Sequence, residues 1–506
     1  PPLSTENMLM DAFSEPSEPA MVVDEKDLPS VPDEIPDSPA GVQDITFDPA
    51  MAESARTLEE KLEQLSQERD AVVENKGIDD VPQSESQIAP SVGEAEAKAE
   101  ASTSESQIAP PVGEAAVLQS ESKIELSVGE AAVKVEAMAL KKVGLDVIHL
   151  EQEIKEESLP DYLIPALMDA MKGKAPSPSL ESFVNALPAL AWALSKRASS
   201  VRGSETPPTC VSLSTSPVGL VNAILIALLE PESEVLVPNP GSPQLKAVAH
   251  LAGAKTVEYD ASKVCASSLN QLISDKTRAV LVESPNRLTG VALDESTLAE
   301  IAEFLKERKV WLVSDESGST SCSEHPSALR VTTANDNAII VDDLSYPLGI
   351  SGWGCAHAIL PEKMARRVES VQAALFGSIP PMPQYTLLAA LKADAQQGLI
   401  ENKKKYLQDS RKMAQDILGQ LPGVMLSEPQ SGLHIAMDVS GLLLPADEVA
   451  QVLLEEVQVA CLPGADFGSK GSNILRISLA TEQGELRAAL EKVGSCICQI
   501  AEDMSV

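Results

Sequence analysis

The sequence has few aromatic side chains, few histidines and no long apolar run. Phe, Trp and Tyr together make up 3% of the 506 residues. No stretch reaches the roughly 18 consecutive apolar residues that a membrane-spanning helix needs, and no signal peptide is visible. The five histidines show no metal-site spacing. We therefore predict neither a membrane segment nor a metal centre.

Cysteine is sparse as well. The seven cysteines are scattered and odd in number, and none forms a zinc-type CxxC pair. This pattern is typical of free thiols in a reducing compartment. We predict a cytoplasmic protein whose cysteines have packing roles.

Basic residues are scarce relative to acidic ones. The chain holds 39 Lys and Arg against 76 Asp and Glu, a formal net charge of −37. Residues 1–150 alone carry 32 acidic and 10 basic residues. So acidic a chain repels DNA, RNA and anionic lipid, so we predict no nucleic-acid and no membrane partner.

The N-terminal part lacks the apolar residues that a core requires. Residues 1–82 are predicted to be a disordered acidic segment with one short amphipathic helix near 51–73. This helix could bind a partner or be a solvated, marginal helix. Because the chain begins with two prolines and not with Met, we expect a processed or partial product.

Residues 83–142 contain a degenerate repeat. The motif SESQIAPSVGEA begins at Ser84 and returns in altered form at Ser104 and Ser120. Three short copies without aromatic residues cannot stack into a solenoid. We predict a flexible acidic tether, and a docking or phosphorylation role stays open.

From residue 143 the pattern becomes globular. Residues 143–200 are predicted to be a helical segment leading into the fold, 201–385 a large domain, and 386–506 a small C-terminal α+β domain. We interpret residues 198–217 as a linker because Ser, Thr and Pro are frequent there. The expected strands are 234–238, 256–259, 278–283, 310–314 and 338–341, and the expected helices are 218–229, 245–252, 267–273, 295–308, 401–421, 446–456 and 482–502.

This alternation predicts an α/β fold. Short apolar strands alternate with amphipathic helices, which is typical of a mostly parallel sheet sandwiched by helices. Polar residues follow the strand ends, where open α/β sheets bind ligands.

Six motifs occur in a fixed order between residues 211 and 493. They are EVLVPNPGSP, AVLVESPNRLTG, WLVSDES, AIIVDDLSYPLGISGWG at 338–354, EPQSGLHIAMDVS and NILRISLA. Together they resemble class I/II aminotransferases, the fold type I enzymes that depend on pyridoxal phosphate. The resemblance implies an aminotransferase large domain with a smaller domain, and a homodimer.

The resemblance also implies roles for four residues. Asn286 matches the donor to the pyridine O3′, Asp315 the partner of the pyridine nitrogen, and Arg476 the arginine that binds the substrate carboxylate. Ser345 lies in the cofactor loop, so we regard Asn286, Asp315 and Ser345 as vestigial cofactor-binding residues. Asn286 could instead be a turn residue, Asp315 a cap or ion-pair partner, and Arg476 the partner of a buried acid.

Other family positions carry different residues. The lysine that forms the Schiff base is replaced by Tyr346, and the arginine that binds the cofactor phosphate by Gly354. Further departures are Asp343 for a serine, Gly318 for a tyrosine, Ser242 for the stacking aromatic, and Pro217 in the phosphate cradle. Without the amine, transamination through the usual lysine is out of reach. We predict a pseudoenzyme with no catalytic residue and no tightly bound cofactor, pyridoxal phosphate being implied by family only.

Residues 143–187 resemble a narrower group. They are similar to the start of the C-terminal, aminotransferase-like half of plant-type methionine S-methyltransferase. In that family a separate N-terminal domain transfers methyl from S-adenosylmethionine to methionine, and the C-terminal half is proposed to be regulatory. No such domain is recognisable in this sequence.

Three functions stay open. The chain could be a non-catalytic module that binds a small amino acid, or an interaction protein that works through its acidic segment. It could also be an active aminotransferase in which another lysine serves, Lys363 being the nearest one downstream.

Overall fold

The computed structural model describes residues 145–152, 159–172, 186–319, 326–428 and 432–504, and in addition Val133, Lys134, Ala137 and Leu140. All belong to one of the two compact units of the chain. The predicted segment 1–82 and most of the predicted tether 83–142 lie outside the described residues. Within the tether, the four described residues are helical, and Ala137 packs against Leu454 and Ala460.

The large lobe is built on a mixed, mostly parallel sheet. Among the described residues, seven strands pair in the order β2-β8-β7-β6-β5-β3-β4. Only β8 runs antiparallel to its neighbours β2 and β7. The strands are β2 (Val211–Ser214), β3 (Glu234–Asn239), β4 (Lys255–Asp260), β5 (Thr277–Glu283), β6 (Trp311–Asp315), β7 (Ala338–Asp342) and β8 (Ala356–Ile359). The predicted α/β class is confirmed.

Helices cover both faces of this sheet. Successive residues of a strand point to opposite faces, so on β7 Ile339 and Val341 join one apolar cluster and Ile340 joins another. We name the two faces after their first large helix. The α7 face carries α7 (Pro217–Leu228), α8 (Pro243–Leu251) and α12 (Glu362–Phe376); the α6 face carries α6 (Pro188–Arg202), α10 (Glu295–Arg308), α11 (Ala328–Val331) and α13 (Pro381–Gln397).

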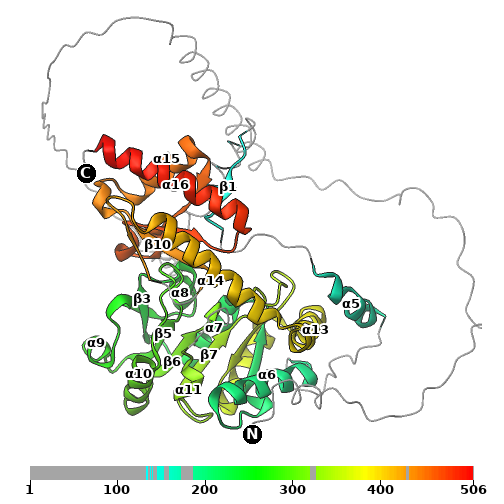
Figure 1. The fold of residues 1–506 in the computed structure, drawn as a ribbon. Coiled ribbons are helices and arrows are strands. Elements are labelled where there is room, and N and C mark those ends of the chain that lie inside the picture. The colour runs from blue at the N-terminus through cyan, green and yellow to red at the C-terminus, as the bar shows by residue number, and fades with distance from the viewer. Residues whose placement is uncertain are drawn as a thin grey trace, which may run out of the picture. The chain divides into compact units, whose positions relative to one another are not determined.

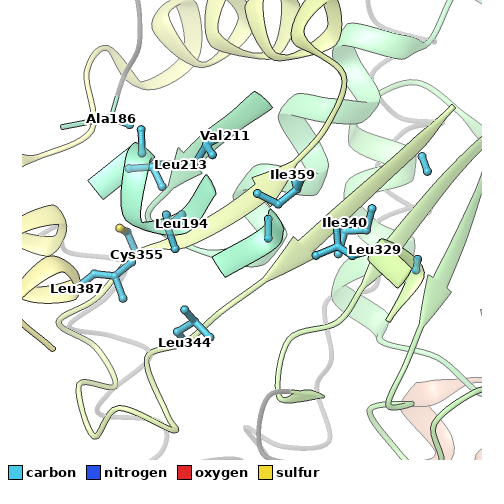
Figure 2. Close-up of a cluster of buried hydrophobic side chains, with 14 of the residues drawn as sticks. Ala186, Leu194, Val211, Leu213, Leu329, Ile340, Leu344, Cys355, Ile359 and Leu387 are labelled. Carbon is cyan, nitrogen blue, oxygen red and sulfur yellow. The ribbon is translucent and has the colours of Figure 1, made fainter. Parts of the chain in front are cut away.

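The α6 face holds a large part of the core. Figure 2 shows Leu194 of α6 and Leu329 of α11 with Ile340 and Ile359 of the neighbouring strands β7 and β8. Each of these side chains is at most 8% exposed. The same cluster takes in Leu387 of α13, which joins this helix to the large lobe.

The small lobe has its own sheet and core. Strands β12 (Leu462–Pro463), β13 (Ile474–Ser478), β10 (His434–Asp438) and β9 (Met425–Leu426) form an antiparallel sheet in that order. Helices α14 (Leu399–Leu418), α15 (Ala446–Val457) and α16 (Gln483–Asp503) pack on it, and Figure 1 shows α14 continuing from this lobe over the large one. Upstream, β1 (Ile148–His149) pairs in parallel with β11 (Val459–Ala460), and the remaining helices are α5 (Ile164–Met171) and α9 (Ala266–Asn270).

The interpretation of residues 198–217 as a linker is wrong. Helix α6 continues to Arg202, and Val211–Ser214 forms strand β2, which pairs with β8. The strand is hard to recognise in the sequence because Ser212 and Ser214 alternate with its apolar residues, although both serines are buried. The predicted domain boundary between residues 385 and 386 falls inside α13, whose apolar residues pack with the large lobe.

The described part of the chain shows neither a membrane-spanning helix nor a metal-binding cluster. None of its helices combines the length and apolar character needed to cross a bilayer. No group of three His, Cys, Asp or Glu side chains within it could hold a metal ion.

Candidate functional site

Asn286 organises the turn that follows strand β5. Its Oδ1 accepts hydrogen bonds from the backbone N–H of Leu288 (3.1 Å) and of Thr289 (3.0 Å), and its Nδ2 donates to the carbonyl oxygen of Pro240 (2.9 Å). The side chain is 7% exposed. Both ends of the amide are therefore engaged within the protein, which is the turn role that the sequence left open.

Asp315 ends strand β6 and lies beside a second acid and an arginine. Its Oδ2 is 3.8 Å from Nη2 of Arg287, and its Oδ1 accepts from the backbone N–H of Ser317 (3.0 Å). The sheet register pairs Asp315 with Glu283 of β5. Both carboxylates are 5% exposed, so Arg287 supplies positive charge to a buried acidic pair.

Glu283 is strongly perturbed by this setting. Burial and, next, the neighbouring charge of Asp315 together raise its pKa to about 7, although a hydrogen bond from Ser242 and the charge of Arg287 act in the opposite direction. That bond runs from the Ser242 backbone N–H to Glu283 Oε1 at 2.7 Å. Two like charges in one buried site favour a proton on one of them.

Arg476 projects from β13 into the same region. Its Nη2 donates to the carbonyl oxygen of Glu151 at 3.0 Å, and its guanidinium lies 5.4 Å from the centre of the Phe467 ring. Nearby, the pKa of His434 is well below its ordinary value because the ring is buried and faces the charges of Arg476 and Arg287. Arg476, 3% exposed, is thus held by a backbone carbonyl and an aromatic face.

These groups enclose a small cavity. It measures about 50 Å³ and is lined by Asp315, Arg287, Arg476, Phe467 and Ser242, together with a few neighbours. A water molecule occupies roughly 10–15 Å³ on such a scale, whereas small-molecule sites span about 300–1,000 Å³. The cavity has room for a few waters.

The loop at 464–471 of the small lobe closes this cavity against the large lobe. The backbone N–H of Gly241 donates to the carbonyl oxygen of Phe467 at 2.8 Å. Asn239 Nδ2 donates to Ser469 Oγ at 3.0 Å. An ion pair of 2.7 Å joins Lys470 to Asp260 at the rim.

At the N-termini of α7 and α8, a serine side chain of the protein itself caps the helix. Pro217 is the first residue of α7 and has no N–H, while Ser216 Oγ accepts from the N–H of Gly219 at 3.1 Å. At α8, Ser242 Oγ accepts from the N–H of Leu245 at 3.4 Å. Some of the backbone N–H groups that could bind an anion at these two helix starts are therefore absent or already bonded to the capping serine.

The loop after β7 folds tightly on itself. Asp343 Oδ1 accepts from the backbone N–H of Ser345 at 2.8 Å, and the N–H of Ile350 donates to the carbonyl oxygen of Ser345 at 2.8 Å. A Cβ atom added at Gly354 would overlap the Ser345 hydroxyl and would lie 3.0 Å from the Ile350 Cδ1. Position 354 has no space for a side chain.

Tyr346 is part of the core of the small lobe. It is 4% exposed and clusters with apolar residues such as Leu407 and Ile435. The ammonium of Lys403, on α14, lies 4.6 Å from the centre of its ring and 5.8 Å from that of Tyr406. Lys363, the lysine considered from the sequence, is exposed on α12.

The structure brings together two of the predicted site residues. Asp315 and Arg476 line the small cavity, while Asn286, Ser345 and Tyr346 lie outside its lining. Sequence reasoning missed Glu283, Phe467, His434 and Lys403, and also Arg287, although Arg287 directly follows Asn286 in the recognised motif.

The cysteines in the described part are all free thiols. Burial raises the pKa of Cys355 and of Cys461 to about 12. Hydrogen bonds from Ser267 and Ser268 lower the pKa of the partly exposed Cys265.

Sequence comparison places this two-lobed fold in a known protein family. The family described as "Aminotransferase class I and II" matches residues 165–493. This chain belongs to the class I and II aminotransferase family.

Sequence relatives agree with this assignment, and solved structures share the fold. The chain is 29% identical to an aspartate aminotransferase of Thermotoga maritima over 371 residues, 71% of this chain and 93% of that protein. It is 25% identical to a probable aspartate/prephenate aminotransferase of Aquifex aeolicus, over 72% of this chain and 94% of that one. Among solved structures, the Thermus thermophilus aspartate aminotransferase with maleate matches with a TM-score of 0.67 and 24% identity, covering 75% of this chain and 98% of that chain.

Proposed function

We propose that this chain is a non-catalytic aminotransferase-fold module whose cofactor cleft has become part of the core. The observation that carries the proposal is the pairing of Asp315 with Arg287 beside a cavity of about 50 Å³. In this proposal Asp315, the residue matched to the partner of the pyridine nitrogen, has its counter-charge inside the protein.

The residues present do not fit pyridoxal phosphate. A phosphate dianion needs several charge-assisted hydrogen bonds, each worth about 1.5–3 kcal/mol. Here Gly354 stands at the arginine position without room for a side chain, Pro217 donates no N–H, and the carboxylate of Asp343 would repel the anion. We derive no reaction step through this cofactor.

A second candidate function is an active aminotransferase that uses a different lysine. The observation that favours it is the ammonium of Lys403, which lies 4.6 Å from the ring centre of Tyr346, the residue at the Schiff-base position. Lys403 comes from α14 and not from the loop after β7, so a cofactor bound to it would need a different orientation.

Trapping of a Schiff base separates the two functions. The full chain is incubated with pyridoxal phosphate, reduced with borohydride and mapped by peptide mass spectrometry. The proposal predicts only sparse labelling spread over exposed lysines, unchanged in a Lys403→Gln variant. Stoichiometric labelling of Lys403 that disappears in this variant would establish the second function, with Lys363→Gln as the matched control.

The proposal extends to the place of this module in a larger protein. We propose that it is the regulatory half of a methionine S-methyltransferase-like protein that acts as a cytoplasmic homodimer. Support for the link is the resemblance of residues 143–187, of which 145–152, 159–172, 186 and 187 are described. Sequencing of the full-length transcript tests the link, because an upstream methyltransferase domain is expected and its absence would refute it.

A further inference from the structure

A second and much larger cavity lies on the α6 face of the sheet. It measures about 580 Å³, within the range of roughly 300–1,000 Å³ that small-molecule sites span. Consecutive residues at a strand end point to opposite faces. Accordingly Asp315 lines the small cavity, while Glu316 lines the large one.

Two arginines line this cavity without a partner of their own. Arg197 comes from α6 and Arg330 from α11. Neither guanidinium makes a hydrogen bond or ion pair with any other residue in the described part of the chain. An arginine fork of this kind matches the two oxygens of a carboxylate.

Two acids of the cavity wall, Glu316 and Asp342, already accept hydrogen bonds from the protein, and the third, Glu295, is exposed at the start of α10. Glu316, 2% exposed, accepts from Ser314 Oγ at 3.1 Å and from the backbone N–H of Ala328 at 2.8 Å. Asp342 accepts from the backbone N–H of Asp343 at 2.8 Å. The cavity therefore offers cationic groups for a ligand more readily than anionic ones.

A buried histidine in the wall also lacks a partner. His357 of β8 is 5% exposed, and its Nδ1 is buried without a hydrogen bond in the described structure. Its pKa is lowered to about 3 by burial and by the charge of Arg197, so the ring is neutral and can donate one hydrogen bond and accept another. A polar atom buried in this way costs about 1–3 kcal/mol unless a ligand or water satisfies it.

The rest of the wall is apolar. Leu194, Leu329, Ile340 and Ile359 line the cavity, and Figure 2 shows these four side chains grouped between α6, α11 and strands β7 and β8. Apolar walls of this kind with a few polar groups are typical of sites for small organic molecules.

We propose that this cavity binds an organic carboxylate with an apolar body. The carboxylate binds Arg197 and Arg330, the neutral His357 ring hydrogen-bonds to the ligand, and the apolar body packs on the leucine and isoleucine wall. Two sources share this chemistry, an α-amino acid and a 2-oxo acid. The site lies apart from the cofactor cleft, so the inference stands whether or not that cleft binds pyridoxal phosphate.

Calorimetric titration of the full chain tests this site. The probes are L-leucine, its 2-oxo analogue and inorganic phosphate. At least one organic acid is expected to bind at one site per chain, and more tightly than phosphate. The one that binds identifies the source as an amino acid or an oxo acid.

Variants then locate the site. Arg197→Met and Arg330→Met each remove a charge-assisted bond and should weaken binding at least tenfold. Arg487→Met is the matched control, because Arg487 is exposed on α16 and pairs only loosely with Glu491. Arg330 is itself exposed, so its variant should fold, and a thermal melt checks this.

Three results would overturn the inference. They are no binding of either organic acid, phosphate binding as tight as theirs, and unchanged affinity in both arginine variants.

Discussion

Arg287 and Asp315 form an ion pair at the carboxyl ends of strands β5 and β6, and the carboxylate of this pair is buried. Their charged atoms are 3.8 Å apart, and Glu283 lies beside Asp315 in the sheet register. Because both carboxylates are buried, the guanidinium of Arg287 offsets part of their negative charge.

Removing the guanidinium should destabilise the protein. Arg287→Met removes the positive charge that faces two buried carboxylates, and we expect a loss of about 1–3 kcal/mol in the free energy of unfolding. Chemical denaturation measures it. Arg278→Met is the control, because that guanidinium hydrogen-bonds to backbone carbonyl groups at the start of β5, and its loss should change the free energy of unfolding by less than about 0.5 kcal/mol. Equal effects of the two changes would contradict the role given to Arg287.

Glu283 should make stability depend on pH. Its pKa rises from 4.5 to about 7 in the folded protein, so between these values the folded state binds more protons than the unfolded one. Stability should fall as pH rises through this window, by an amount on the order of 3 kcal/mol. Other buried groups titrate there too, so the measurement is the difference between the wild type and Glu283→Gln, which keeps the acceptor for Ser242.

The matched control for this experiment is Glu369→Gln. Burial raises the pKa of Glu369 to about 7 as well, but this side chain lies on α12. The two variants should change the pH profile independently, and their effects should add in the double variant. A Glu283→Gln profile parallel to that of the wild type would refute the prediction.

Restoring the family arginine should not restore cofactor binding. Gly354→Arg places a Cβ against the Ser345 hydroxyl and Ile350, so we expect a loss of about 1–3 kcal/mol in stability and no gain in pyridoxal phosphate affinity. The added change Ser345→Gly should recover part of the stability by removing the overlap. A stable Gly354→Arg variant that binds the cofactor would contradict this prediction, because the loop would then have room for the side chain.

Thiol reactivity should follow burial. Cys265 is partly exposed and its pKa is lowered, so iodoacetamide should modify it early in the native protein. Cys355 and Cys461, with pKa values of about 12, should react only after denaturation. Peptide mapping over time gives the order, and early labelling of either buried thiol would contradict the described core.

Much of the fold could be predicted from the sequence because buried parallel strands consist of short runs of apolar residues. Strand β7 and helix α10 are found where the sequence predicts them, and for α10 Asp294 caps the first turn by accepting from Thr297 N at 2.7 Å. Strand β2 escaped prediction because buried serines alternate with its apolar residues.

The site could be predicted only in part. The order of the motifs in the sequence pointed to Asp315 and Arg476. It could not show that Arg287 pairs with Asp315, because this contact depends on how the turn after β5 packs against the end of β6. Likewise, Lys403 reaches Tyr346 from a helix with no sequence motif. The hydrogen bonds of Asn286 agree with a turn role, one of the two roles that the sequence left open.

The stoichiometry of bound pyridoxal phosphate tests the central claim most directly. The full chain is saturated with the cofactor, passed through a desalting column and denatured, and the released cofactor is counted per chain, with the Thermotoga maritima aspartate aminotransferase treated in parallel. A closed cleft predicts far less than one cofactor per chain. One cofactor retained per chain would contradict the account.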